Sequence, residues 1–513
     1  MNKVFKTISG MFIIMLLAKV LGQAREVLLA WFYGTGTQAS AFLTASQIPL
    51  NFFDMILGLA IVSAFVPVFN EYYQKEGETE ANRFANNFIG VVLIISAALA
   101  AIGIIFSDFV IKVIASGFDT QTARLASNLL KIMFPSLIFT AVAYSYAGIV
   151  QSYGEFKLPA AMSIASNLVA ILYFLVFNDI GGIFGLSVAM LIGWGLQLII
   201  LIPALIRFKY RFGLSFDFLH PGMKKVYKLA LPILLSSWVQ PLNVMINLYL
   251  ASFIDGGNAV SYINYANKLY IIIVGVFAMS VTNLILPRLS RLFADNQTKE
   301  SADVITSSLR AGILFIVPVM FLFLIFSYQI VEIVYMRGAF DSKSVYMTST
   351  ALFFYSFGML GYGLQEILNK SFYSMQNSVV PMKNAFFTIV INIALSFLLY
   401  RQMGVGGLAL SSAIASVFSA VNLTIQIKRK VKQIKLRDII SLLIKATVCA
   451  GVSCLISRVL YTFLISLYTP GFFVKFTVLA LSVLFTFVIY IAGLLILRVK
   501  DFKNILKRGV DSD

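Results

Sequence analysis

The run from Phe476 to Leu497, FTVLALSVLFTFVIYIAGLLIL, contains 22 consecutive residues without a charged side chain. A helix of this length rises about 33 Å, enough to cross the hydrocarbon core of a membrane. Similar apolar blocks, each of about twenty residues, recur along the chain of 513 residues. Hydrophobic residues make up 59% of the chain and charged residues 12%, whereas soluble chains carry about 25% charged residues. The sequence therefore predicts an all-α polytopic membrane protein.

Hydropathy and turn residues together predict fourteen transmembrane helices. They are expected near residues 7–33, 39–70, 84–106, 125–151, 159–178, 183–207, 226–253, 260–293, 304–327, 345–374, 381–400, 406–428, 438–463 and 473–498. With this count, the loops of one side hold roughly 25 Lys and Arg residues and those of the other side about 5, a bias typical of the cytoplasmic face. Both termini are therefore predicted to be cytoplasmic.

The remaining bulk features exclude several classes of protein. The formal net charge of +18 lies mostly in short loops on the predicted cytoplasmic side, so nucleic-acid binding is not expected. Cys449 and Cys454 point in different directions on one apolar helix, and His220 is the single histidine. No metal site, cofactor, catalytic residue or nucleophile–base pair is predicted, and the chain is not expected to be an enzyme.

An internal repeat divides the chain. Gly182-x-x-Gly185-Leu186 matches Gly404-x-x-Gly407-Leu408 at an offset of 222, and Leu29-Ala-Trp-Phe32 matches Leu250-Ala-Ser-Phe253 at 221. Because the offset spans six helices, the repeat is parallel and predicts two six-helix lobes around a central cavity, an architecture suited to alternating access. The predicted division is an N-terminal lobe at 1–222, a C-terminal lobe at 223–432, and two further helices with a tail at 433–513.

Ionisable residues at membrane depth indicate function by default. The first helix carries Lys19, Arg25 and Glu26, a cluster with one positive charge in excess. Such a cluster suits an anion site. The alternative is an internal ion pair that only locks this helix to a neighbour.

Further polar residues are predicted to line the same cavity. Lys268 matches Gln47 in the repeat, and Asp54 could balance one of the cations. Asn243 and Asn247 lie on one face of the seventh helix. The alternatives are a lysine that snorkels to the interface and an asparagine stripe that only joins helices. A cavity rich in Arg and Lys with apolar walls suits a lipid-linked pyrophosphate.

The run Lys19-Val-Leu-Gly-Gln-Ala-Arg-Glu26, with Phe32-Tyr-Gly34 and Phe65-Val-Pro67, resembles the MurJ (MviN) family of lipid II flippases. The superfamily also contains polysaccharide flippases and multidrug antiporters. The resemblance covers essentially the whole chain, including the two additional C-terminal helices. It implies that Lys19, Arg25 and Lys268 engage a lipid pyrophosphate and that the last two helices form a groove for the lipid tail.

The sequence departs from that family in its second and eighth helices. Many members carry an arginine pair near Phe53 and Asp54, and acidic residues at the positions of Ser40 and Asn267. Lysine also replaces arginine at two positions. These departures leave the glycan of the cargo open.

The predicted function is a flippase that moves lipid II from the inner to the outer leaflet of the bacterial cytoplasmic membrane. The alternatives are a flippase for another lipid-linked oligosaccharide, such as a capsule or exopolysaccharide precursor, and a cation-coupled drug antiporter. The expected partners are lipid II or a related undecaprenyl-pyrophosphate glycolipid, membrane lipids and cell-wall synthesis proteins.

Overall fold

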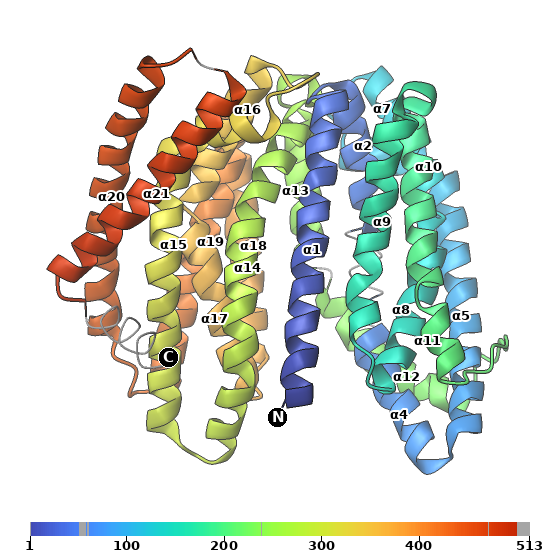
Figure 1. Cartoon of the computed structure of the whole chain (residues 1–513). Coiled ribbons are helices and arrows are strands. Elements are labelled where there is room, and N and C mark those ends of the chain that lie inside the picture. The colour runs from blue at the N-terminus through green and yellow to red at the C-terminus, as the bar shows by residue number, and fades with distance from the viewer. Residues whose placement is uncertain (1, 51–57, 59–60, 238, 470, 500–513) are drawn as a thin grey trace. The chain divides into compact units, whose positions relative to one another are not determined.

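A computed structural model describes residues 2–50, 58, 61–237, 239–469 and 471–499. Every regular element in this part of the chain is helical (Figure 1). The chain divides into two compact units. The first unit runs to Ser261 and includes Arg337–Phe340, and the second contains Tyr262–Met336 and the residues from Asp341 onward. Asp54 lies outside the described residues.

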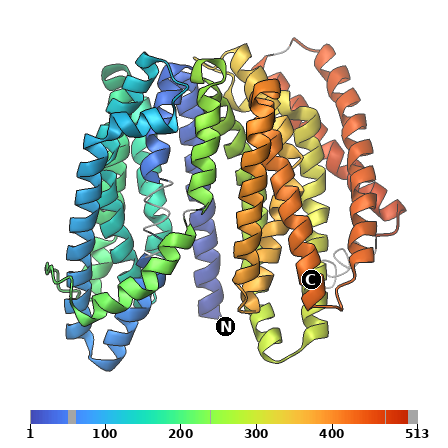
Figure 2. The ribbon, with the colours of Figure 1, turned by 180° about the vertical axis from the view of Figure 1, so that it is seen from behind.

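Thirteen helical elements of the first unit lie between Asn2 and Ser252, and Figures 1 and 2 show the chain from opposite sides. They are α1 (Asn2–Tyr33), α2 (Thr37–Gln47), η2 (Ile61–Phe65), α4 (Val66–Lys75), α5 (Glu78–Ile105), α6 (Ser107–Ile114), α7 (Thr120–Met133), α8 (Ser136–Ser152), α9 (Lys157–Val176), α10 (Asn178–Ile199), α11 (Ile202–Arg207), α12 (Pro221–Ser237) and α13 (Val239–Ser252).

The short 3-10 turn η3 (Asp255–Gly257) follows α13, and α14 (Ala259–Ala294) begins in the first unit and continues in the second. The other helices of the second unit are α15 (Thr298–Tyr335), α16 (Ser342–Ser356), α17 (Met359–Ser374), α18 (Val379–Met403), α19 (Val405–Lys430), α20 (Leu436–Ser466) and α21 (Phe472–Ile496).

Nine helical segments of the described chain are long and apolar enough to cross a membrane. They are Glu78–Ile105, Thr120–Ser152, Lys157–Val176, Asn178–Arg207, Thr298–Tyr335, Val379–Met403, Val405–Lys430, Leu436–Ser466 and Phe472–Ile496. A membrane span must satisfy its own backbone hydrogen bonds, which a helix does within one segment. The helical fold class agrees with the prediction.

Several predicted helices are interrupted or differently bounded in the structure. The segment predicted at 125–151 is divided into α7 and α8 at Pro135, which has no N–H to continue the helical ladder. The segment predicted at 345–374 is divided into α16 and α17 next to Gly358. The region after Ile105, predicted as a loop, forms the short helix α6, whose Ile111 and Ile114 side chains are buried.

An aromatic cluster forms part of the core of the first unit. The ring of Phe65 stacks on Phe88 with centroids 4.3 Å apart, and Tyr72 stacks on Phe84 at 4.9 Å. These rings join the end of η2 and the helix α4 to α5. Burial of large aromatic surfaces fixes the position of α5 against the elements that precede it.

Two glycines 222 residues apart adopt the same unusual backbone conformation. Gly182 has φ 52° and ψ −150°, and Gly404 has φ 54° and ψ −129°. These dihedral angles lie in or near a region that is essentially restricted to glycine. Gly404 separates α18 from α19, and Gly182 interrupts α10 with a kink a few residues after α9 ends. The repeat seen in the sequence is therefore reproduced in the backbone at this position.

A second pair of equivalent positions caps two helices. Asp119 accepts hydrogen bonds from the backbone N–H groups of Gln121 and Thr122 at the start of α7. Asp341, 222 residues later, accepts one from the N–H of Ser344 at the start of α16. Both aspartates satisfy N–H groups that a helix cannot satisfy internally.

The loops before these caps make reciprocal contacts within the first unit. The N–H of Gly117 donates to the Ser252 hydroxyl at 2.9 Å, and the N–H of Ala339 donates to the Trp31 carbonyl at 2.8 Å. Trp31 and Ser252 are equivalent positions of the repeat, 221 residues apart. Each loop therefore packs on the end of the first helix of the opposite repeat.

The last two helices belong to the core of the second unit. The Tyr490 hydroxyl of α21 donates to the Leu314 carbonyl of α15 at 3.1 Å. Lys475 at the start of α21 forms an ion pair of 2.7 Å with Glu332 of α15. The buried Cys454 of α20 packs with Phe326 of α15 in the same apolar cluster. Contacts along α15 thus hold α20 and α21.

Candidate functional site

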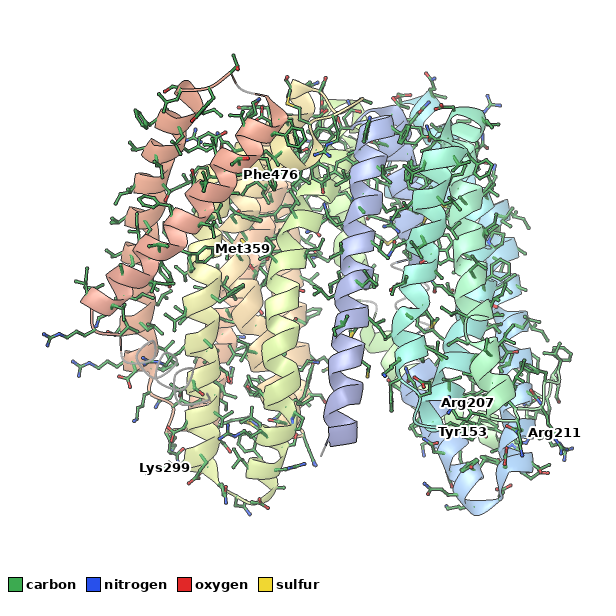
Figure 3. The ribbon with its side chains drawn as sticks, viewed as in Figure 1. Tyr153, Arg207, Arg211, Lys299, Met359 and Phe476 are labelled. Carbon is green, nitrogen blue, oxygen red and sulfur yellow. The ribbon has the colours of Figure 1, made fainter. Side chains whose placement is uncertain are left out.

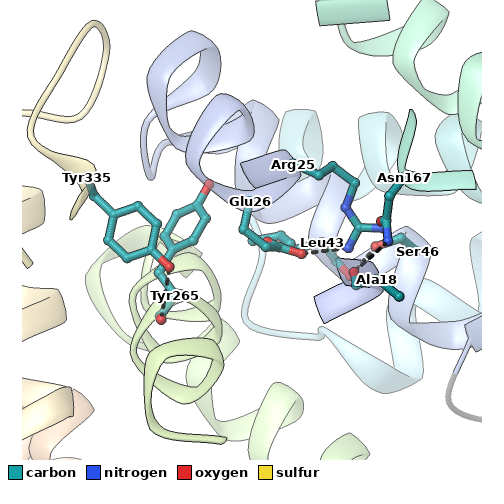
Figure 4. A network of polar contacts seen from close by, with 8 residues as sticks. All are labelled: Ala18, Arg25, Glu26, Leu43, Ser46, Asn167, Tyr265 and Tyr335. Carbon is teal, nitrogen blue, oxygen red and sulfur yellow. Dashed lines mark hydrogen bonds and ion pairs between the residues drawn. The ribbon is translucent and has the colours of Figure 1, made fainter. Parts of the chain in front are cut away.

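The polar cluster of α1 occupies a small pocket inside the first unit. A guanidinium N–H of Arg25 donates to the Glu26 carboxylate at 2.7 Å. Glu26 is 4% exposed, and the Arg25 side chain retains 22% exposure. Figure 4 shows Arg25 turned toward Glu26, with Ser46 and Asn167 nearby. The two charges that the sequence places next to each other therefore form an ion pair.

Helices α2, α9 and α10 complete the wall of this pocket, which has a volume of about 20 Å³. Apolar side chains dominate the wall: Leu29, Phe42, Leu43, Leu50, Phe174, Leu186 and Met190. A space of this size admits about one water molecule. A low-dielectric surrounding strengthens the attraction between Arg25 and Glu26 and raises the cost of separating them.

Asn167 of α9 is a polar residue of this region that the sequence analysis missed. Its amide donates to the Ala18 carbonyl of α1 at 3.3 Å, and the residue is 7% exposed. The ring of Phe174, also on α9, stacks on Phe32 of α1 with centroids 5.6 Å apart. An asparagine inside the apolar run of α9 was the available signal, because a buried amide in a membrane helix needs a partner.

The other predicted residues of the first unit lie on different elements. Lys19 is half-buried on α1, and Gln47 is half-buried at the end of α2. Asn243 and Asn247 are half-buried on α13, where the amide of Asn247 donates to the Asn243 side-chain oxygen at 3.5 Å. The two amides therefore lie on one face of α13, and their place in a substrate site stays a prediction.

Lys268 is a half-buried residue of α14 in the second unit. One turn earlier on α14, the carbonyl of Tyr265 accepts a hydrogen bond of 3.4 Å from the hydroxyl of Tyr335, on α15 (Figure 4). The two rings lie 5.1 Å apart, and both residues are fully buried. This contact fixes the turn of α14 that precedes Lys268.

No group of three or more His, Cys, Asp or Glu side chains suited to a metal ion occurs in the described part of the chain. The pocket of Arg25 offers a guanidinium, a carboxylate and the Ser46 hydroxyl within apolar walls, and the Asn167 amide lies nearby. Such groups bind and orient an anion or a polar headgroup.

The family model described as "Lipid II flippase MurJ" matches residues 29–497 of the chain. The chain belongs to the MurJ family. This family consists of transporters rather than enzymes. The resemblance noted in the sequence is therefore confirmed, as are the polytopic helical fold and its place in a membrane.

Two curated MurJ relatives illustrate the extent of the likeness. A probable lipid II flippase MurJ of Rickettsia prowazekii (strain Madrid E) is 26% identical over 498 residues, covering 96% of this chain and 97% of that protein. The corresponding protein of Buchnera aphidicola subsp. Schizaphis graminum (strain Sg) is 28% identical over 417 residues, covering 80% and 81%.

Solved structures show the same fold. A lipid II flippase MurJ in an inward closed conformation superimposes with a TM-score of 0.80 at 24% identity, covering 98% of this chain and 99% of that one. A multidrug resistance MATE family transporter of the MOP superfamily, in an inward-facing conformation, gives a TM-score of 0.69 at 12% identity, covering 81% and 95%. This chain therefore has the fold of these MurJ and MATE structures.

Proposed function

We propose that this chain is a flippase that moves lipid II from the cytoplasmic to the outer leaflet by alternating access. The observation that carries the proposal is the match of residues 29–497 to the lipid II flippase MurJ family. The charge pair inside α1 supports it, because ionisable residues at membrane depth indicate a transport function. The bacterial cytoplasmic membrane is the corresponding location.

The proposed architecture has fourteen spans with both termini cytoplasmic. Five spans are added to the nine apolar segments of the described chain. They are built by α1, by α2 with α4, by α12 with α13, by α14, and by α16 with α17. The shared conformation of Gly182 and Gly404 supports two parallel six-helix repeats. The division at 1–222, 223–432 and 433–513 stays a prediction.

The proposed substrate site consists of Lys19, Arg25, Glu26, Gln47, Asp54, Asn243, Asn247 and Lys268. Arg25 is the central element of the proposal. Its planar guanidinium can bind a pyrophosphate through two N–H groups, and its side chain retains 22% exposure while paired with Glu26. Glu26 holds the guanidinium in place before the substrate arrives.

A second candidate is a flippase for another undecaprenyl-pyrophosphate-linked glycan. The observation that favours it is the neutral residues Ser40 and Asn267, where the resemblance leads us to expect acidic ones. Ser40 is 1% exposed, so its replacement alters the interior of the protein. A different balance of charge in the transport path would suit a different glycan.

Complementation tests the proposal. The chain is expressed in a bacterium depleted of its own lipid II flippase, and both growth and the accessibility of lipid II on the outer leaflet are measured. We expect the native chain to restore both and Arg25→Ala to restore neither, although that variant inserts normally. Arg401→Ala, which removes an exposed arginine near the end of α18, is the matched control and should behave like the native chain. Failure of a well-inserted native chain would favour the second candidate.

A further inference from the structure

A pocket of about 440 Å³ lies at the N-terminal end of α5, within the first unit. Its walls come from the first turns of α5 and from the extended segment at residues 208–220, which connects α11 to α12. Figure 2 shows this segment beside one end of α5. The pocket shares no lining residue with the small pocket of Arg25 and Glu26.

Two consecutive asparagines of α5 hold the segment in place. The side-chain oxygen of Asn86 accepts hydrogen bonds from the Tyr210 hydroxyl at 2.6 Å and from the N–H of Gly213 at 3.2 Å. The Asn86 amide donates to the Arg211 carbonyl at 2.8 Å. Asn87 exchanges two hydrogen bonds with the backbone of Asp217, at 2.8 and 2.7 Å. The pocket is therefore built by specific tertiary contacts.

Three cations line this pocket. Arg83, Lys209 and Arg211 are exposed there together with one carboxylate, that of Glu78. A second carboxylate, Glu80, contacts Arg83 only loosely, at 3.8 Å between exposed side chains. The first turn of α5 adds N–H groups that no side chain caps, which favours a negative ligand. The net charge of the lining attracts an anion.

Asn82 is the second indication of a ligand. The residue is 5% exposed and lines the pocket, yet its side-chain oxygen is buried without a hydrogen-bond partner among the described residues. A buried amide oxygen without a hydrogen-bond partner is costly. Its oxygen and nitrogen are interchangeable by a flip, so it can either accept from a ligand hydroxyl or donate to a ligand oxygen.

The same segment presents a row of exposed apolar side chains. Phe212, Leu214 and Phe216 alternate along the extended backbone and are 51%, 61% and 48% exposed. Beyond Arg83, α5 carries no charged residue as far as Ile105, a distance of about 33 Å along the helix axis. Arg83 therefore lies at one boundary of an apolar span, where lipid headgroups meet hydrocarbon.

Basic residues beside exposed apolar residues are typical of protein surfaces that lie in the membrane interface. Figure 3 shows Arg207 and Arg211 near one end of the first unit. A soluble anion would need the cations alone. It would gain nothing from the exposed row of Phe212, Leu214 and Phe216.

We propose that this pocket binds the headgroup of an anionic glycerophospholipid. Arg83, Lys209 and Arg211 bind the phosphate. The Asn82 side-chain amide forms a hydrogen bond with a headgroup hydroxyl or a phosphate oxygen. The acyl chains lie against the exposed apolar row. The proposal concerns a surface separate from Arg25 and does not rest on the identity of the transported cargo.

Native mass spectrometry of the full chain, titrated with phosphatidylglycerol and with phosphatidylcholine, tests the site. We expect the triple variant Arg83→Gln, Lys209→Gln, Arg211→Gln to bind phosphatidylglycerol about 100-fold more weakly, since each basic residue near an anionic lipid strengthens binding about fivefold. The matched control is Arg429→Gln, Lys430→Gln, Lys432→Gln, which removes three exposed charges of the second unit. An equal loss in both triple variants would overturn the proposal.

Two further variants separate the sources of phosphate. Phe212→Ser, Leu214→Ser, Phe216→Ser should weaken phosphatidylglycerol binding at least tenfold and leave the binding of glycerol 1-phosphate unchanged. Asn82→Leu should weaken phosphatidylglycerol binding and leave phosphatidylcholine binding, which is weak from the outset, unchanged. If the native chain binds glycerol 1-phosphate as tightly as phosphatidylglycerol, the pocket is a site for soluble anions and the lipid proposal is wrong.

Discussion

The hydroxyl oxygens of Ser40 and Ser261 lie 2.8 Å apart, and both residues are buried. The two serines are 221 residues apart, the offset at which Leu29–Phe32 matches Leu250–Phe253. Equivalent positions of the repeat therefore contact each other through a single hydrogen bond. A neutral pair satisfies both hydroxyls. An acidic residue in place of Ser40 would bury a charge beside Ser261.

The Ser40–Ser261 bond should appear as an energetic coupling. We expect Ser40→Ala and Ser261→Ala each to lower the free energy of unfolding by about 1 kcal/mol, because each leaves the other hydroxyl without this partner. The double variant should cost little more than either single one. Unfolding titrations in mixed micelles measure the cycle. Strictly additive losses would mean that the two hydroxyls do not interact.

Removing Glu26 should destabilise the protein more than removing the whole pair. Glu26→Ala leaves the Arg25 guanidinium in an apolar pocket without its carboxylate, and loss of one partner of a buried pair costs about 3 kcal/mol. The double variant Arg25→Ala, Glu26→Ala leaves no uncompensated charge there and should recover part of this loss. The melting temperatures of the three proteins in one detergent provide the comparison. A double variant less stable than Glu26→Ala would contradict the expectation.

The two equivalent glycines should tolerate alanine poorly. Gly182→Ala and Gly404→Ala place a Cβ on a backbone with positive φ, at an expected cost of about 1–3 kcal/mol each. At Gly182 such a Cβ would point into open space, with no atom of a packing neighbour within 4 Å, so the cost there comes from the backbone conformation. Gly195→Ala is the control, since that site is equally open and has no positive φ. Unfolding titrations should show a loss for the first two variants and none for the control.

The aspartate caps should lose their effect in acid. Hydrogen bonds from the backbone and side chain of Thr122 hold the pKa of Asp119 below its ordinary value, and the hydroxyl and N–H of Ser344 do the same for the pKa of Asp341. Stability from a carboxyl with a lowered pKa is present above the unfolded pKa of about 3.9 and is lost as the pH falls below it.

The double variant Asp119→Ala, Asp341→Ala tests this pH dependence. At pH 7 it should be less stable than the native chain by about 1 kcal/mol for each cap. The difference in melting temperature should stay constant down to pH 5 and narrow between pH 4 and pH 3. A difference that widens in acid would show that the carboxylates are not stabilising.

The helical fold class and the internal repeat were predictable, because both follow from residues that are close together in the sequence. Hydrocarbon leaves a spanning segment no backbone partner except itself, so an apolar run such as Phe476–Leu497 must be helical. Turn residues also act locally: Gly404 separates α18 from α19, and Gly182 kinks α10 near its start. The break at Pro135 was missed because apolar residues on both sides hide it from hydropathy.

The candidate site was only partly predictable. Arg25 and Glu26 are adjacent, so their pairing required no knowledge of packing. The approach of Asn167 to Ala18 joins residues 149 apart, and the hold of Asn86 on the segment near Arg211 joins residues 125 apart. Distant segments meet only when their surfaces fit.

The sequence by itself determined that the chain is a helical membrane protein of the MurJ family with an internal repeat. Hydropathy, turn residues and motifs suffice for this, because each is a property of residues that are close together in the sequence. Only the tertiary structure decided that Ser40 meets Ser261, that apolar walls from three other helices enclose Arg25, and that α5 carries a cationic pocket beside Phe212. These features depend on which helical faces bury each other. The packing of helical faces minimises the free energy of the whole fold, so it cannot be predicted from any one segment.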